Sequence, residues 1–154
     1  LFPDIAPMHV ESFKLHIDNG YYNGTIFHRV IPGFMIQAGD PNTKRTNKAS
    51  YGTGGHAAKY YGIGEENDSN SWTLPAEFSD IQHRRGIVSM ARSNDPNSAG
   101  SQFFIVTADT PHLNGKYTVF GEVVSGMEIA EMISYLPRDA RDNPEQRVEI
   151  ISTE

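Results

Sequence analysis

The chain contains no cysteine among its 154 residues, which excludes a disulfide framework and thiol chemistry. It also lacks any apolar run near the ~20 residues that a membrane-spanning helix needs, and it has no linker-like tract and no internal repeat. We therefore expect one domain over residues 1–154, a monomer that does not bind membranes. The missing cysteine favours a cytoplasmic location, although secreted proteins can also lack cysteine.

Basic side chains are scarce. Thirteen Lys and Arg stand against nineteen Asp and Glu, for a net charge of −6, which argues against general nucleic-acid binding. The local exception is Lys44, Arg45 and Lys48, which we interpret as part of a solvated loop. The six histidines form no His-x-His or His-x3-His pair, so the sequence predicts no metal site.

Glycine and proline are scattered along the chain rather than clustered. Fourteen Gly and nine Pro in this arrangement favour a turn-rich β architecture. Residues 42–70 are polar and Gly-rich, and are predicted to form a long surface loop. The hydrophobic pattern predicts helices over 7–19 and 127–136, and strands over 21–31, 34–38, 86–91, 102–107, 119–123 and 148–151.

The run 27–37 places a cation and a carboxamide inside an otherwise apolar, strand-like segment. Alternation before the Pro-Gly break predicts that Phe27 and Arg29 share one face of a strand. After the break, Met35 and Gln37 should share a face in the same way. A guanidinium costs too much to bury without a partner or a purpose. The run therefore indicates a binding site.

A second run, 101–106, repeats this mixture of polar and large apolar side chains. Alternation puts Gln102 and Phe104 on one face of its strand, with the intervening side chains on the other. The alternative is that Arg29 is a surface arginine of an edge strand, paired with a carboxylate such as Asp40. Four residues are assigned to the core instead: Phe27, Phe103, Ile105 and Phe120.

These two runs resemble the signatures of the cyclophilins, the cyclosporin-binding peptidyl-prolyl isomerases. Residues 27–40 resemble the first signature, and residues 86–91 and 100–105 resemble the second. The resemblance extends from Leu1 to about Ile151. It implies a mainly β fold, a cyclophilin-like antiparallel β-barrel capped by two α-helices. The family normally begins with a further strand region before the segment seen at 1–7, so we expect an N-terminally incomplete chain with an open barrel edge.

The resemblance also implies an activity, cis–trans isomerisation of X-Pro bonds in proline-containing peptides and unfolded proteins, without cofactor or metal. By this resemblance Arg29 is the catalytic residue. The implied substrate-binding residues are Phe34, Met35, Gln37, Ala91, Arg92, Ser93, Gln102, Phe104, His112, Leu113 and Tyr117. A non-catalytic proline-motif binding module is the alternative. Arg29 argues against that alternative, because binding alone needs no donor at the prolyl nitrogen.

Three matched positions depart from the family pattern. Arg92 stands where the family most often has Asn, and Tyr117 replaces a histidine of the pocket wall. His112 occupies the position of a tryptophan that hydrogen-bonds cyclosporin, so we expect weak cyclosporin binding with retained isomerase activity. Residues 52–55 match the loop beside a second, shallower pocket. That loop lacks the Gly-Lys-Ser/Thr ending of a phosphate-binding loop.

Overall fold

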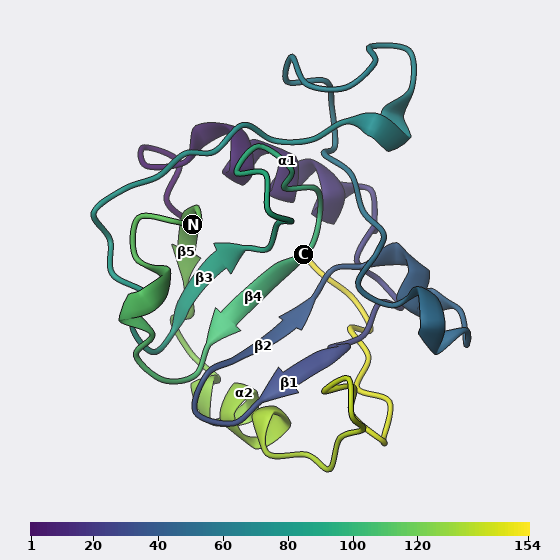
Figure 1. Ribbon diagram of the computed structural model, residues 1–154, viewed down its shortest axis with the longest axis vertical. Coiled ribbons are helices and arrows are strands. Elements are labelled where there is room, and N and C mark those ends of the chain that lie inside the picture. The colour runs from purple at the N-terminus through teal and green to yellow at the C-terminus, as the bar shows by residue number, and fades with distance from the viewer.

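An antiparallel sheet of five strands forms the centre of the computed structural model, which describes residues 1–154 (Figure 1). The strands lie side by side in the order β1-β2-β4-β3-β5. Two α-helices and several short 3-10 helices complete the fold. The elements are α1 (Pro7–Asp18), β1 (Arg29–Ile31), β2 (Met35–Ala38), β3 (Ile87–Met90), β4 (Phe103–Val106), β5 (Val119–Glu122) and α2 (Met127–Ser134).

Both helices pack against the same face of the sheet, α1 towards one end of the strands and α2 towards the other (Figure 1). Val10 of α1 belongs to a buried cluster with Phe103 and Phe120. Met127 of α2 packs in a separate cluster with Val30. The opposite face of the sheet is left to the side chains that alternate with these, which include those of Arg29 and Gln37.

The N-terminus of α1 is capped from a distant part of the chain. Pro7 occupies the first turn, where its missing N–H is not needed. The side chain of Ala6 at the N-cap cannot accept a hydrogen bond, and the carboxylate of Glu77 takes over that role. It accepts from the backbone N–H groups of Met8 and His9 at 3.1 and 2.9 Å.

The helix predictions are confirmed, with ends one or two residues earlier than expected. The predicted strand over 21–31 is wrong for its first part. Gly20 and Gly24, with φ of +63° and +80°, make turns there, and regular pairing begins only at Arg29. Phe27 and Arg29 therefore do not share a strand face, because Phe27 packs into the core on the helix side.

The sheet is not closed by hydrogen bonds, because β1 and β5 each pair with a single strand and not with each other, so the predicted barrel is open at its edges. Residues 148–151, the predicted last strand, form no regular strand. Val148 and Ile150 nevertheless exchange three backbone hydrogen bonds with residues 24–27, around an isolated bridge between Ile26 and Glu149. At the free edge of β1, the N–H of Val30 donates instead to the carbonyl of Asp142, which lies in a turn. An irregular segment thus occupies the edge where a closing strand would pair.

The long segment 42–70 is a loop, as predicted, interrupted by short 3-10 helices at Lys48–Ser50 and Ser69–Ser71. A further 3-10 helix spans Pro41–Lys44. No helix of the fold has both the length and the apolar character to cross a bilayer.

Candidate active site

Strand register places the key side chains in one row across the sheet. Arg29 of β1 is opposite Gln37 of β2, and Gln37 is opposite Phe104 of β4. Phe104 in turn is opposite Ser89 of β3. Since side chains of directly paired residues point to the same face, the guanidinium, the carboxamide and the phenyl ring form a continuous strip.

An apolar pocket of about 160 Å³ opens along this strip. Tyr117 stands edge-on to the ring of Phe104, with centroids 5.9 Å apart and planes at 84°. The guanidinium of Arg92 covers the outer face of Tyr117 at 4.5 Å, a cation–π contact. The other lining residues are Arg29, Phe34, Met35, Gln37, Ala91 and Leu113. Such a pocket, apolar but with two guanidinium groups at its edge, suits a small aliphatic ring joined to a polar backbone.

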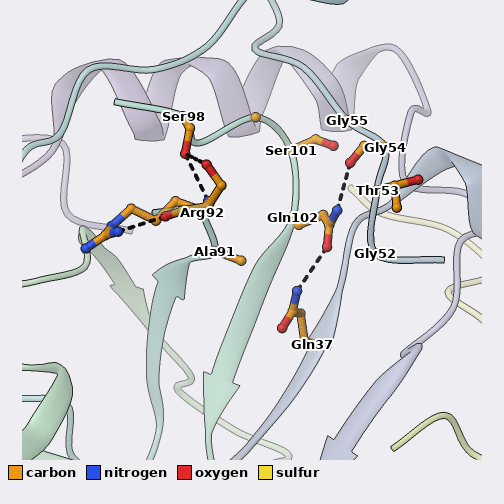
Figure 2. A pocket seen from close by; sticks show the side chains of 12 residues that line it. Gln37, Gly52, Thr53, Gly54, Gly55, Ala91, Arg92, Ser98, Ser101 and Gln102 are labelled. Carbon is orange, nitrogen blue, oxygen red and sulfur yellow. Dashed lines mark hydrogen bonds between the residues drawn. The ribbon is translucent and has the colours of Figure 1, made fainter. Parts of the chain in front are cut away.

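A chain of carboxamide hydrogen bonds holds the polar edge of this pocket. Nη1 of Arg29 lies 3.5 Å from Oε1 of Gln37, and Nε2 of Gln37 donates to Oε1 of Gln102 at 2.9 Å. Gln102 then donates to the carbonyl of Gly54 at 2.8 Å (Figure 2). The Nε and Nη2 donors of Arg29 have no partner within the protein, so they remain free to bind a ligand.

A buried carboxylate fixes the loop at the end of this chain. Asp40 is fully buried, and its side chain accepts from the backbone N–H groups of Asn42, Gly52 and Gly54 at 2.8, 2.5 and 3.3 Å. The proposed alternative, an Asp40–Arg29 pair, is therefore wrong. Asp40 shapes the loop, and Arg29 is held by Gln37.

A polar pocket of about 240 Å³ adjoins the apolar one. Figure 2 shows the loop 52–55 on one side of it and the segment after β3 on the other. The side chain of Arg92 points away from the loop 52–55 and donates to the carbonyls of Lys116 and Ser93. The pocket is lined mostly by backbone and small polar groups, which fits recognition of an extended peptide backbone.

The structure brings eleven of the twelve residues predicted for the site to these two pockets. Nine line the apolar pocket, and Ser93 and Gln102 line the polar one. His112 lines neither; it is exposed at the rim, with its ring 5.5 Å from that of Phe34. Their functional roles stay predictions. No group of three or more His, Asp or Glu side chains is placed to hold a metal ion.

A supporting histidine was missed by the sequence analysis. His83 is buried behind Phe104, stacked at 6.1 Å with 16° between the planes. Its Nε2 lies 2.9 Å from Oγ of Ser89, which donates to the carbonyl of Thr118. Burial lowers the pKa of His83, against the opposing effect of its contact with Asn114, so the imidazole is neutral at neutral pH. No local motif marks His83, because its partners come from distant segments.

Comparison with known proteins identifies relatives along the whole chain. A family model described as cyclophilin type peptidyl-prolyl cis-trans isomerase matches residues 1–154. The probable peptidyl-prolyl cis-trans isomerase of Brucella suis is 50% identical over 137 residues, 86% of this chain; the match spans only 63% of that relative's length. The peptidyl-prolyl cis-trans isomerase-like 1 of Aspergillus oryzae is 39% identical over 152 residues, 98% of this chain and 83% of the relative.

Solved structures agree with these matches. A crystal structure of a Cryptosporidium parvum cyclophilin type peptidyl-prolyl cis-trans isomerase superposes with a TM-score of 0.82 at 33% identity, covering 99% of this chain and 85% of the other. A second crystal structure of that protein, determined in the presence of the dipeptide Ala-Pro, gives a TM-score of 0.81 at 34% identity, with 99% and 87% covered.

Proposed function

Because this chain belongs to the cyclophilin-type peptidyl-prolyl cis-trans isomerase family, we propose that it catalyses rotation about X-Pro bonds as one isomerase domain and so assists protein folding. The observation that carries the proposal is the position of Arg29. Its guanidinium lies at the edge of the apolar pocket, next to Gln37, with free donors. Its substrates are proline-containing peptides and unfolded proteins. The Ala-Pro dipeptide used with the Cryptosporidium relative supports this substrate class.

The chemistry requires no nucleophile and no cofactor. Rotation about a peptide bond is opposed by a barrier of ~18–20 kcal/mol, because the nitrogen lone pair is delocalised into the carbonyl. As the bond twists, the lone pair localises on the prolyl nitrogen. A donor aimed at that nitrogen binds the twisted state better than either planar state, and this difference in binding lowers the barrier.

We assign the donor to Arg29 and the anchoring of the ring to the apolar pocket. The guanidinium is permanently charged, so its donors are present at every physiological pH. Gln37 orients it, and the ring of the substrate proline packs against Phe104 and Tyr117. The residue before proline lies along Ala91–Ser93, held through backbone groups facing the polar pocket.

Exchange NMR on a capped Ala-Ala-Pro-Ala peptide tests the proposal against the binding-module alternative. Uncatalysed X-Pro isomerisation takes tens to hundreds of seconds at 25 °C, so an isomerase at substoichiometric amounts gives cis–trans exchange cross-peaks that the free peptide lacks. Heat-denatured protein is the control. A folded protein that shifts the peptide resonances without any exchange would show a binding module and overturn the proposal.

A further inference from the structure

Beyond the free edge of β1 lies another cavity, of about 220 Å³, here called the basic pocket. Arg29 and Gln37 line both this cavity and the apolar pocket, so the two are neighbours. Its outer wall comes from Lys48 in the long loop and Arg141 near the C-terminus. Nothing in the proposed isomerisation mechanism uses that wall.

This cavity is basic, although the chain as a whole is acidic. Arg29, Lys48 and Arg141 face a single carboxylate, Asp139, in a chain whose net charge is −6. Neither Lys48 nor Arg141 belongs to any of the salt bridges of the structure. Oδ1 of Asp139 accepts from the backbone N–H groups of Arg141 and Asn143 at 2.9 and 3.1 Å, so this oxygen is held by its own turn. The cavity thus keeps an excess of two positive charges.

The cationic wall is also preorganised. Nη1 and Nη2 of Arg141 donate to the carbonyls of Lys48 and Tyr51 at 3.1 and 3.2 Å. These bonds fix the guanidinium against the loop while leaving Nε and one hydrogen on each terminal nitrogen free. Tyr51 is itself buried, with its hydroxyl donating to the carbonyl of Arg45. A fixed guanidinium loses less entropy on binding an anion than a mobile one.

The register of the sheet indicates which part of a substrate reaches this wall. The segment that receives the residue before proline begins at Ala91, directly after β3, and the basic pocket lies outside β1. Between them the row from Ser89 through Phe104 to Arg29 crosses four strands. A peptide that follows this row passes the proline pocket first and reaches the basic pocket with the residues that follow proline.

The distance between the proline pocket and the basic pocket indicates which substrate residue reaches the basic pocket. From the proline pocket over β2 and β4 to the region outside β1 is two to two and a half strand spacings, or roughly 10–12 Å at ~4.8 Å per spacing. An extended chain covers ~3.3–3.6 Å per residue, so this distance corresponds to about three residues of backbone, or to two residues plus an extended acidic side chain. We propose that the basic pocket binds the carboxylate of an Asp or Glu two or three residues after the proline, with Lys48 and Arg141 as specificity-determining residues. This inference rests on the proposed isomerase function.

The test compares capped peptides Ala-Ala-Pro-Ala-Xaa-Ala, in which Xaa is Glu, Gln or Lys. Exchange NMR gives kcat/KM and a titration gives Kd, both at low and at high salt. A fourth peptide carries the Glu two residues before the proline. The wild-type protein is compared with Lys48→Gln and Lys48→Glu, and with Lys14→Gln as a control that removes an exposed cation from α1.

We expect the Glu peptide to exceed the Gln peptide by about fivefold in kcat/KM at low salt, with the gap closing at high salt. Lys48→Gln should reduce the difference in kcat/KM between the Glu and Gln peptides. Lys48→Glu should reverse the preference, so that the Lys peptide has the highest kcat/KM, and Lys14→Gln should leave the wild-type preference unchanged. Equal values for Glu and Gln in the wild type, or an unchanged preference in Lys48→Glu, would overturn the inference. If no peptide is isomerised, the proposed function fails, while the Kd values still decide the charge preference.

Discussion

Gln37 donates from Nε2 to Oε1 of Gln102 at 2.9 Å, and this bond joins the two halves of the site. Gln37 lies on β2 beside Arg29, whereas Gln102 directly precedes β4 and reaches the carbonyl of Gly54. Each carboxamide uses its oxygen as an acceptor and its nitrogen as a donor, so the chain of bonds has one direction. The orientation of Arg29 is therefore coupled to the loop that borders the polar pocket.

The variant Gln37→Ala removes both bonds of the central carboxamide. A net hydrogen bond contributes ~0.5–1.5 kcal/mol, so we expect kcat/KM for a proline peptide to fall about tenfold as Arg29 loses its support. The measurement is exchange NMR, with circular dichroism to verify folding. Gln82→Ala, at an exposed position away from the apolar and polar pockets, is the matched control. A folded Gln37→Ala protein with wild-type kcat/KM would refute the positioning role.

Two substitutions at Tyr117 distinguish the contribution of its ring to substrate binding from that of its hydroxyl. Its ring stands against Phe104 and beneath Arg92, and no hydrogen bond involves its hydroxyl. Tyr117→Phe is expected to keep wild-type kcat/KM. Tyr117→Ala should raise KM about tenfold, because burying an aromatic side chain against a ligand ring contributes ~1.5–3 kcal/mol at most. Equal losses in the two variants would assign the role to the hydroxyl and contradict this account.

His112 is the position at which cyclosporin binding should differ from that of the family. Its small, exposed imidazole lies at the rim, 5.5 Å from Phe34. It supplies less apolar area and a different donor geometry than an indole. We expect inhibition of the wild type only at micromolar cyclosporin or above, and tighter inhibition of His112→Trp. Titration of the drug against isomerase activity measures both. Nanomolar inhibition of the wild type would contradict the prediction.

The stability of the fold should depend on pH through His16. Burial lowers the pKa of His16 to about 4, although Nε2 lies 2.9 Å from the carbonyl oxygen of His56. An unfolded histidine titrates near pH ~6.5. Between these values the unfolded chain binds a proton that the folded chain does not, so the free energy of unfolding falls as the pH drops from about 6.5 to 4.

His16→Gln should flatten this dependence. The slope of the free energy of unfolding against pH should decrease by up to ~1.4 kcal/mol per pH unit, the value for one proton. Part of the slope remains, because burial also lowers the pKa values of His28 and His83. Urea denaturation at pH values from 7 to 4.5 gives the free energies, with the exposed His112→Gln as control. Parallel curves for wild type and His16→Gln would show that His16 does not contribute.

The sequence predicted the elements near the site well, because alternation inside short apolar runs survives in any sheet. Alternation located β2, β3, β4 and β5. The residues of the apolar pocket were predicted instead from the resemblance to the cyclophilins. Alternation failed at 21–28, where Gly20 and Gly24 bend the chain before the regular pairing of β1 with β2 begins. The contact at the open edge of β1, where Val30 donates to the carbonyl of Asp142, was not predicted, because no local pattern encodes it.

Contacts between segments that lie far apart in the chain could likewise not be predicted from the sequence. Lys48 is exposed in a loop, as predicted, but only the bond from Arg141, 93 residues away, to its carbonyl makes this loop the wall of a cavity. Asp40 was considered as a partner of Arg29, whereas backbone N–H groups of the folded loop occupy it. In each case the residue type was visible, but the partner was fixed by tertiary packing.

The central claim is that Arg29 stabilises the twisted state of the X-Pro bond rather than the bound peptide. Arg29→Ala, compared with wild type, should be measured for both the cis–trans exchange rate of the bound peptide and its Kd. We predict a loss of roughly 10²–10³-fold in the catalysed rate, as for removal of one preorganised donor, with Kd changed only a few-fold. Equal catalysed rates in the two proteins, or a loss that appears entirely in Kd, would contradict the account.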